Sequence, residues 1–322
     1  MTLIRLAVAA LLLAASPLSF AQAYPDKSRP IRLVVPFGAG SGTDVVVRAY
    51  SRALNEQAGL NSIVDNKPGA EGMIGVEFVK NAASDGYTVL LGNLSTHVLN
   101  VHMQAKLPYD PVADFVPVTA VENLSLVLNT GPSTKFASLK ELLDAARAEP
   151  GKYSFGSGSA STRLVMEMLE HLAGIKLLSV PYKTQAQAAA GLAGGEVDLL
   201  VTDVVTAQPY YANGRLRPLG ATGRTRLSAL PNVPTFREQG VADFEFAAWH
   251  AFFVPARTPP DVVEKLAALL RTAGQSKYVG DALATKASDP MDMDTARLTT
   301  LLRSDIDRWG KLLRDMKKQA RP

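Results

Sequence analysis

The sequence contains no cysteine and only four histidines among its 322 residues. Without cysteine there is no disulfide, thiol nucleophile, cysteine-ligated zinc or iron–sulfur cluster. His97 and His102 are five residues apart, which is the wrong spacing for two metal ligands on one helix face. The sequence therefore predicts no metal site and no cofactor, and it predicts a fold held together by its hydrophobic core alone.

A strong excess of one charge is also missing. The 34 Lys and Arg residues are scattered among 30 Asp and Glu residues, the net charge is +4, and no long basic run is present. Chains that bind nucleic acid usually gather positive charge on one face or along one helix. A nucleic-acid partner is therefore not expected, and the sequence favours a mixed, solvated surface.

Long apolar runs are absent beyond the start of the chain. Arg5 precedes an apolar run at 6–13 that is too short to span a bilayer, and a small-residue sequence, AQA, ends at Ala23. This pattern predicts a secretory signal peptide at 1–23, cut after Ala23, and an exported mature chain. An uncleaved N-terminal anchor is the alternative, which a serine–proline pair within the apolar stretch disfavours.

The rest of the chain alternates short apolar segments with segments of helical pattern. Strands are expected at 31–37, 61–65, 88–92, 124–129, 153–155, 177–182, 197–202, 216–222 and 244–254. Helices are expected at 44–57, 74–83, 139–148, 164–172, 186–192, 260–273 and 295–316. Such alternation is typical of an α/β protein with parallel sheets.

Two glycine-serine turns each follow an expected strand and precede an expected helix. Residues 38–43 read GAGSGT, and residues 156–159 read GSGS. A helix that starts in this way presents backbone N–H groups and partial positive charge to an anion. Ligands of open α/β sheets bind at the carboxyl ends of the strands. The turns therefore predict two similar lobes that face each other across an anion-binding cleft.

Two other interpretations of the first turn are weaker. A dinucleotide site needs the pattern GxGxxG, but Thr43 stands at the position of the third glycine, and export disfavours a cytoplasmic cofactor. An exported α/β hydrolase needs a GxSxG elbow, which the sequence lacks. A serine and a histidine can still meet in space, so the hydrolase stays open as a less favoured alternative.

A set of motifs spread from about Tyr24 to the end of the chain resembles one family, the tripartite tricarboxylate transporter receptors, also called Bug-type periplasmic solute-binding proteins. The order and spacing of the whole set carry the resemblance. The stretches are PFGAGSGTD at 36–44 with Arg48, NKPGA at 66–70 with Gly72, Ile74 and Gly75, DGYT at 85–88, LPYDP at 107–111 with Asp114 and Phe115, VPYK at 180–183, GGEVD at 194–198, LPNVPT at 230–235 with Glu238 and Gly240, and Trp249 with Pro255.

The resemblance implies an α/β, two-lobed periplasmic-binding-protein (Venus flytrap) fold. Each lobe has a mainly parallel sheet flanked by helices, and the ligand cleft lies between the lobes. Lobe 1 is expected at 24–121 plus 241–322, and lobe 2 at 122–240. A monomer is expected.

The same resemblance implies a function outside the cytoplasm. The chain is expected to be a periplasmic receptor, not an enzyme, that captures a small carboxylate and delivers it to the membrane permease subunits of a tripartite transporter. A di- or tricarboxylate, an amino acid and an aromatic acid are all candidate ligands. A ligand-sensing subunit that signals to a membrane kinase is the main alternative.

The resemblance also predicts which residues bind the ligand. They come from the two turns, from the stretch after the third strand, and from the acid that follows the strand at 197–202. The predicted ligand-binding residues are Phe37, Gly40, Ser41, Gly42, Thr43, Asp44, Ser95, Thr96, Ser157, Gly158, Ser159, Ser161, Thr162, Arg163 and Asp203.

Several positions depart from the family pattern. Ser41, Val101 and Thr184 stand where members often carry Gly, Pro and Gly, and Arg163 stands where many carry His. A guanidinium beside a helix N-terminus favours a second carboxylate; the alternative is that Arg163 points to solvent. Asp44 is repelled by a bound carboxylate, so it is expected to cap its helix, accept from a ligand hydroxyl or ammonium, or orient a water.

Overall fold

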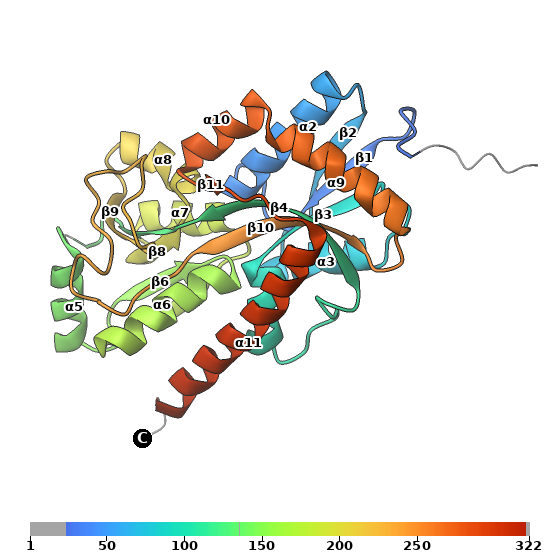
Figure 1. Ribbon diagram of the computed structural model, residues 1–322. Helices are drawn as coiled ribbons and strands as arrows, with labels where there is room; N and C mark the ends of the chain where they lie inside the picture. Colours follow the sequence, from blue (N-terminus) through green and yellow to red (C-terminus); the bar gives the residue numbers. More distant parts are fainter. Residues whose placement is uncertain (1–23, 135, 320–322) are drawn as a thin grey trace, which may run out of the picture.

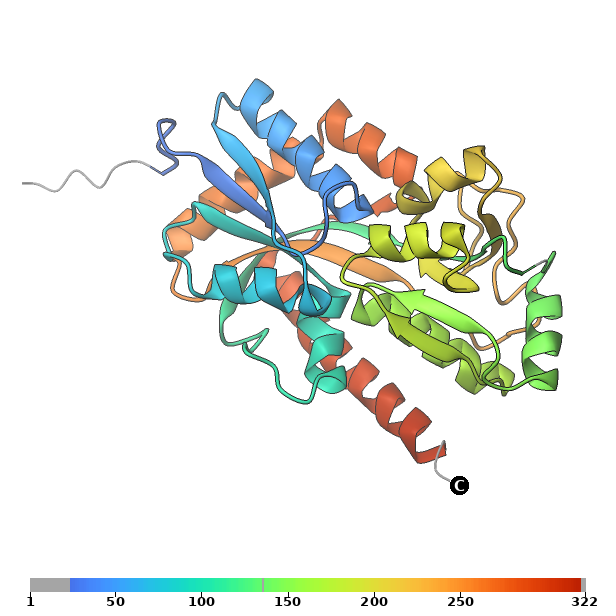
Figure 2. The same ribbon diagram turned by 180° about the vertical axis from the view of Figure 1, so that it is seen from behind.

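Short apolar segments form two separate sheets in the computed structural model, which describes residues 24–134 and 136–319. The first sheet has the strand order β11-β4-β10-β3-β1-β2, and the second has the order β7-β6-β8-β5-β9. Figure 1 and Figure 2 show the sheets in two adjacent lobes, with helices packed around each. The predicted two-lobed α/β fold is confirmed, and the predicted signal peptide at 1–23 lies outside the described residues.

The first lobe contains both ends of the described chain. Its strands are β1 (Ile31–Val35), β2 (Ser62–Asn66), β3 (Thr88–Asn93), β4 (Phe115–Leu124), β10 (Ala248–Pro255) and β11 (Asp289–Pro290). Its helical segments are α2 (Gly42–Gln57), η1 (Ala70–Gly72), α3 (Met73–Lys80), η2 (Ser95–Leu99), α4 (Asn100–Met103), α9 (Pro260–Gly274), α10 (Lys277–Lys286) and α11 (Thr295–Gln319).

The second lobe is formed by one continuous part of the chain. Its strands are β5 (Val127–Thr130), β6 (Ser154–Ser157), β7 (Leu178–Pro181), β8 (Leu199–Thr202) and β9 (Arg217–Ala221). Its helices are α5 (Leu139–Ala148), α6 (Ala160–Ala173), α7 (Gln185–Gly194) and α8 (Val204–Ala212). Strands β8 and β5 are buried along their whole length, and the apolar sequence of β8 predicts this for β8.

The strand pairing is mixed, so the expectation of mainly parallel sheets needs correction. Strand β1 is parallel to β2 and β3, and β6 is parallel to β7 and β8. Strand β10 is antiparallel to β3 and β4, and β5 is antiparallel to β8 and β9. The chain leaves the first lobe along β4 and returns along β10, so these two strands run in opposite directions.

The lobes are joined at two crossings. The outward crossing lies between Leu124, where β4 ends, and Val127, where β5 begins. The return follows the segment 222–247, in which the Phe246 N–H donates to Thr222 O at 3.0 Å before β10 begins at Ala248. The predicted lobe boundary at 121 falls inside β4, and the one at 240 falls in the return segment. Hydrophobic core residues of both lobes form one continuous cluster through these crossings.

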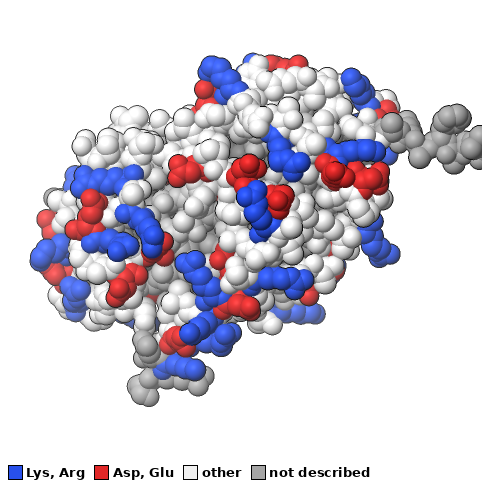
Figure 3. All heavy atoms as spheres, viewed as in Figure 1, with Lys and Arg blue, Asp and Glu red and all other residues white. Residues whose placement is uncertain are grey.

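Helix α11 packs along the crossing strands of the first lobe. The Trp249 indole Nε1–H on β10 donates to Asp305 Oδ2 on α11 at 2.8 Å, in a buried contact. No helix of the described ranges is both long enough and apolar enough to cross a membrane. On the face seen in Figure 3, basic and acidic side chains lie interspersed over both lobes, which agrees with the mixed surface that the composition predicts.

Candidate functional site

Four helices begin where the two lobes meet. Their N-cap residues are Ser41 on α2, Ser159 on α6, Thr184 on α7 and Asp203 on α8, and each cap side chain accepts an N–H bond from its own first turn. A helix start leaves four backbone N–H groups without intrahelical partners, and a cap satisfies only one of them. The remaining N–H groups and the helix dipoles make this region favourable for an anion without requiring a cationic side chain.

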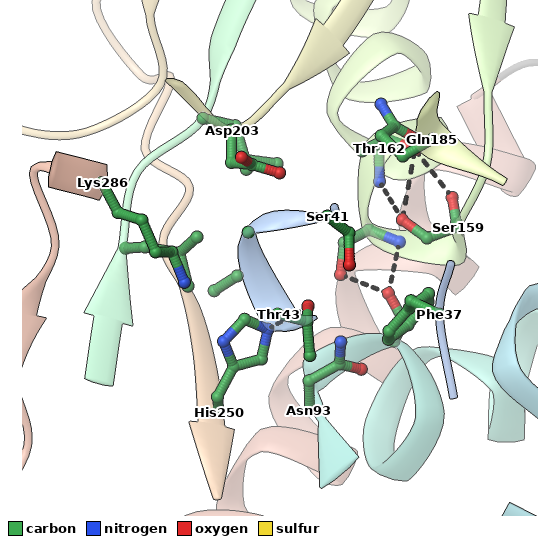
Figure 4. A pocket seen from close by; sticks show the side chains of 16 residues that line it. Phe37, Ser41, Thr43, Asn93, Ser159, Thr162, Gln185, Asp203, His250 and Lys286 are labelled. Atoms are coloured by element: carbon green, nitrogen blue, oxygen red, sulfur yellow. Dashed lines mark hydrogen bonds between the residues drawn. The ribbon is translucent and has the colours of Figure 1, made fainter. Parts of the chain in front are cut away.

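The four helix starts line one cavity between the lobes (Figure 4). The cavity has a volume of about 70 Å³, which is several times the space that one buried water molecule needs. Hydroxyl, amide and apolar groups from both lobes form the walls. The lining residues are Phe37, Ser41, Gly42, Thr43, Asn93, Ser95, Leu124, Leu126, Ser159, Ser161, Thr162, Gln185, Asp203, Ala248, His250 and Lys286.

The structure brings most of the predicted ligand-binding residues to this cavity. Those that line it are Phe37, Ser41, Gly42, Thr43, Ser95, Ser159, Ser161, Thr162 and Asp203. The others lie behind or beside the wall: Gly40, Asp44, Thr96, Ser157, Gly158 and Arg163. Contact with a ligand stays a prediction for both groups.

The two lobes touch across the cavity. Ser95 Oγ of η2 lies 2.7 Å from Ser161 Oγ of α6 and accepts the Ser161 N–H at 2.9 Å. A Cβ added to Gly42 would lie 2.7 Å from Asp203 Oδ1, so only a glycine lets the first turn approach the start of α8 this closely. A Cβ on Gly38 would lie 3.3 Å from Thr184 Cγ2. These contacts correspond to a closed arrangement of the lobes.

Asp44 stabilises the first turn from behind the cavity. Its carboxylate accepts the Gly40 N–H at 2.9 Å, Arg48 Nε at 2.8 Å and Asn66 Nδ2 at 2.9 Å. Burial alone would raise the pKa of Asp44, but these bonds and the charge of Arg48 lower it below its usual value. The expectation that Asp44 caps its helix is wrong, because Ser41 is the N-cap of α2 and Asp44 is the third residue of the helix. Asp44 instead holds the residues ahead of the helix.

Arg163 is directed away from the cavity wall. Its guanidinium forms an ion pair with Glu71 of the first lobe, and its Nε lies 3.8 Å from Glu167 Oε1 on the next turn of α6. About a quarter of the Arg163 side chain is exposed (26%), so it lies neither in bulk solvent nor in the cavity. It is part of the contact between the lobes.

Sequence reasoning missed several lining residues: Asn93, Leu124, Leu126, Gln185, Ala248, His250 and Lys286. Asn93 comes directly after the predicted strand at 88–92, and Gln185 follows an N-cap threonine. These are signals that place a polar side chain at a strand end or a helix start. His250 lies in the middle of an apolar strand, and Lys286 lies on a helix that was not expected. Neither position carries a local signal for a binding site.

His250 and Lys286 converge on one buried acid, Glu122 of β4. The His250 Nδ1–H donates to Glu122 Oε1 at 2.6 Å, the Lys286 ammonium bonds the same oxygen, and the Ser288 hydroxyl donates to Oε2 at 2.5 Å. Burial alone would raise the pKa of Glu122, but the charge of Lys286 and the hydrogen bonds hold it well below its usual range. Burial lowers the pKa of His250, although Glu122 opposes this, so the ring is neutral at pH 7.

Thr43, His250 and Glu122 have the group order of a hydrolytic triad. Thr43 Oγ1 lies 3.4 Å from His250 Nε2, and the other ring nitrogen faces the carboxylate. In a working triad the carboxylate stabilises the imidazolium that forms when the nucleophile loses its proton. Here Lys286 neutralises Glu122 and burial disfavours the imidazolium, so the arrangement is poorly suited to activate Thr43.

This chain is similar to known proteins of one family. The model of the tripartite tricarboxylate transporter family receptor matches residues 46–317. Protein BugT of Bordetella pertussis is 32% identical over 304 residues, which cover 94% of this chain and 92% of BugT.

Solved structures give the same result. The periplasmic binding protein BugD matches with a TM-score of 0.85 and 27% identity, covering 91% of this chain and 99% of BugD. An R. palustris protein with adipate matches with a TM-score of 0.86 and 28% identity, covering 91% and 98%. MatC from Rhodopseudomonas palustris, with bound malate, matches with a TM-score of 0.81 and 27% identity, covering 88% and 98%.

Proposed function

The chain belongs to the tripartite tricarboxylate transporter receptor family, and we propose that it captures a small carboxylate between its lobes and delivers it to the membrane permease subunits of a tripartite transporter. Members of the family are periplasmic solute-binding receptors and not enzymes. The proposal includes export of this chain, with removal of residues 1–23, and action as a monomer in the periplasm.

The convergence of four helix starts on one cavity is the observation that carries the proposal. The described cavity wall combines the N-terminal turns of α2, α6, α7 and α8 with the hydroxyl groups of Ser41, Thr43 and Ser161. A carboxylate accepts hydrogen bonds and carries the charge that helix starts stabilise. A ligand between the lobes contacts both at once, so binding favours the closed arrangement.

The solved relatives support a short dicarboxylate as the ligand class. One carries adipate and another carries malate, and both share the fold of this chain at more than 25% identity. The two acids have two carboxylates each and differ in length and in a hydroxyl group. We propose that this chain binds an acid of that class.

A thermal-shift screen followed by calorimetry tests the proposal. The panel contains succinate, malate, adipate and citrate, with butyrate and hexanoate as single-carboxylate comparisons. A ligand at 100 times its dissociation constant adds about 2.7 kcal/mol to the free energy of unfolding, so a true ligand raises the melting temperature clearly. If no acid of the panel raises it, the proposal is wrong.

Turnover is tested separately, because the Thr43–His250–Glu122 arrangement is the one feature that favours a hydrolase. We expect no release of nitrophenol from p-nitrophenyl acetate above that of a Thr43→Ala variant. Equal, background-level rates for the two proteins support a receptor that does no chemistry. A rate that is at least tenfold higher for the unaltered chain supports the hydrolase instead.

A further inference from the structure

We propose that Lys286 binds the second carboxylate of a short dicarboxylate, and that Glu122 and His250 position its ammonium group. The inference rests on the proposed carboxylate-binding function and adds the charge that the cavity selects. Lys286 is the last residue of α10, its side chain is fully buried, and it lines the cavity. It is the single Lys or Arg among the lining residues of the described chain.

Unused donors of Lys286 point to a missing acceptor. An ammonium group carries three N–H donors, and the described residues supply one acceptor for them, Glu122 Oε1. A fully buried cation with unpaired donors is unfavourable unless another acceptor completes its shell. Lys286 is one of the lining residues of the cavity, although its side chain has no exposed surface. A group bound in the cavity is therefore the acceptor that can do this once the side chains over the ammonium group shift.

Glu122, the acceptor of the Lys286 ammonium, also accepts bonds from other groups, which fix its position and that of the ammonium. Glu122 Oε1 takes bonds from both Lys286 and His250, and Oε2 takes the Ser288 hydroxyl. These groups come from β4, from β10 and from the two ends of the turn after α10, so they hold the cluster from three sides. Glu122 therefore balances the charge of Lys286 but accepts only one of the three N–H groups of its ammonium.

The arrangement of the cavity fits a ligand with a charge at each end. In Figure 4, Lys286 and His250 lie on one side, Ser159, Thr162 and Gln185 lie on the opposite side, and the first turn lies between them. One carboxylate at the helix starts and a second at Lys286 would span this space.

Asp203 is the one acid among the lining residues of the described ranges. Both of its oxygens accept bonds from Thr206, the N–H at 2.9 Å and the hydroxyl at 3.0 Å. Its charge is therefore stabilised at the start of α8, which reduces its repulsion of a bound dicarboxylate.

A double variant, Glu122→Gln with Lys286→Met, tests the inference because it removes both charges and keeps similar side-chain volumes. The probes are succinate, malate and adipate, compared with butyrate and hexanoate, in calorimetry on the exported chain. We expect the affinity for the dicarboxylates to fall about tenfold or more, the size expected for a lost hydrogen bond to a charged group, while the single-carboxylate acids bind as before.

The control is Lys80→Met, which removes one positive charge from α3, where Lys80 pairs with Asp114 at 2.9 Å outside the cavity. It should leave all affinities unchanged. If the double variant keeps the dicarboxylate affinity of the unaltered chain, the role of Lys286 is wrong although the proposed function stands. If the unaltered chain binds none of the acids, the proposed function fails and the inference fails with it.

A second measurement needs no substitution. With ¹⁵N-labelled lysine, the Nζ signal of the fully buried Lys286 is the one best protected from exchange with water. Saturation with adipate or succinate should shift this signal, whereas hexanoate should not. An unshifted signal at saturating dicarboxylate contradicts the inference even if the double variant fails to fold.

Discussion

Arg163 and Glu71 form a forked ion pair between the lobes, with Nη1 and Nη2 each 3.3 Å from one carboxylate oxygen. Ala70 and Glu71 adopt left-handed backbone angles, with φ of 48° and 52°, which cost roughly 1–3 kcal/mol each in residues other than glycine. Burial raises the pKa of Glu71, although Arg163 and Gln104 oppose this. A contact made only when the lobes meet stabilises the closed form.

Replacement of Glu71 by Gln should therefore weaken ligand binding. We expect a loss of affinity of about 5- to 30-fold, corresponding to about 1–2 kcal/mol of closed-state stabilisation, with little change in melting temperature. Calorimetry measures the affinity, and solution scattering of the unliganded variant should show a larger radius of gyration. If Arg163 instead grips the ligand directly, the variant frees its guanidinium, and affinity stays constant or rises.

Asp44 gives a second prediction. Asp44→Ala leaves the Gly40 N–H, Arg48 and Asn66 without their shared acceptor, so the first turn should lose its fixed shape. We expect the free energy of unfolding to fall by about 1–3 kcal/mol and ligand affinity to fall with it. Arg48→Met is the matched control, because it removes one partner from the exposed side and leaves the carboxylate in place. Unchanged stability and affinity in Asp44→Ala contradict this role.

Local sequence was sufficient to place the two turns and the helices that follow them. A glycine-serine stretch between an apolar strand and a helix has one simple outcome, a capped helix start at the carboxyl end of a strand. Ser41 and Ser159 are caps of this kind, and both lie at the cavity. The same pattern predicted that the two turns face each other across a cleft, and the resemblance to a family added the residues expected to bind the ligand.

The floor of the cavity could not be predicted in this way. Glu122 lies within β4, where no strand was expected, because the predicted strand at 124–129 corresponds to β5. Its role depends on partners far away in the chain, His250 and Lys286. Helix α10 was missed because it contains Gly280, a residue of low helix propensity, and because its apolar positions form no clear stripe. The sequence marked Arg163 as a candidate for binding a carboxylate. The direction of its side chain depends on Glu71, and no local sequence pattern predicts that these two residues lie opposite each other.

Gly42 gives a third prediction, on closure. A Cβ at this position would meet Asp203 Oδ1 at 2.7 Å across the lobes, but its backbone angles are ordinary for any residue. Gly42→Ala should therefore fold normally and resist closure, so its ligand affinity should fall at least tenfold. Gly280→Ala is the control: its Cβ meets nothing within 4 Å, and it should stabilise α10 by about 0.5–1 kcal/mol without changing affinity. Equal affinities for Gly42→Ala and the unaltered chain contradict the closed geometry.

His97 gives the last prediction, on acid stability. It is fully buried and stacked on Phe253 at 3.9 Å between ring centroids, Nδ1 lies 2.9 Å from Thr96 Oγ1, and Nε2 has no partner within the described chain. Burial lowers the pKa of His97 to about 3. Between that pH and 6.5 the unfolded state holds a proton that the folded state lacks, so stability falls as the pH falls.

The expected slope is up to about 1.4 kcal/mol per pH unit from this one residue. Urea unfolding at pH 7, 6, 5 and 4 measures it. In His97→Gln the slope should be smaller by up to about 1.4 kcal/mol per pH unit, the contribution of one proton. The lowered pKa values of His250 and Glu122 act in the same direction, so His97→Gln also loses stability as the pH falls. Only the difference in slope between this variant and the unaltered chain reports on His97. Identical slopes for His97→Gln and the unaltered chain contradict a neutral, buried His97.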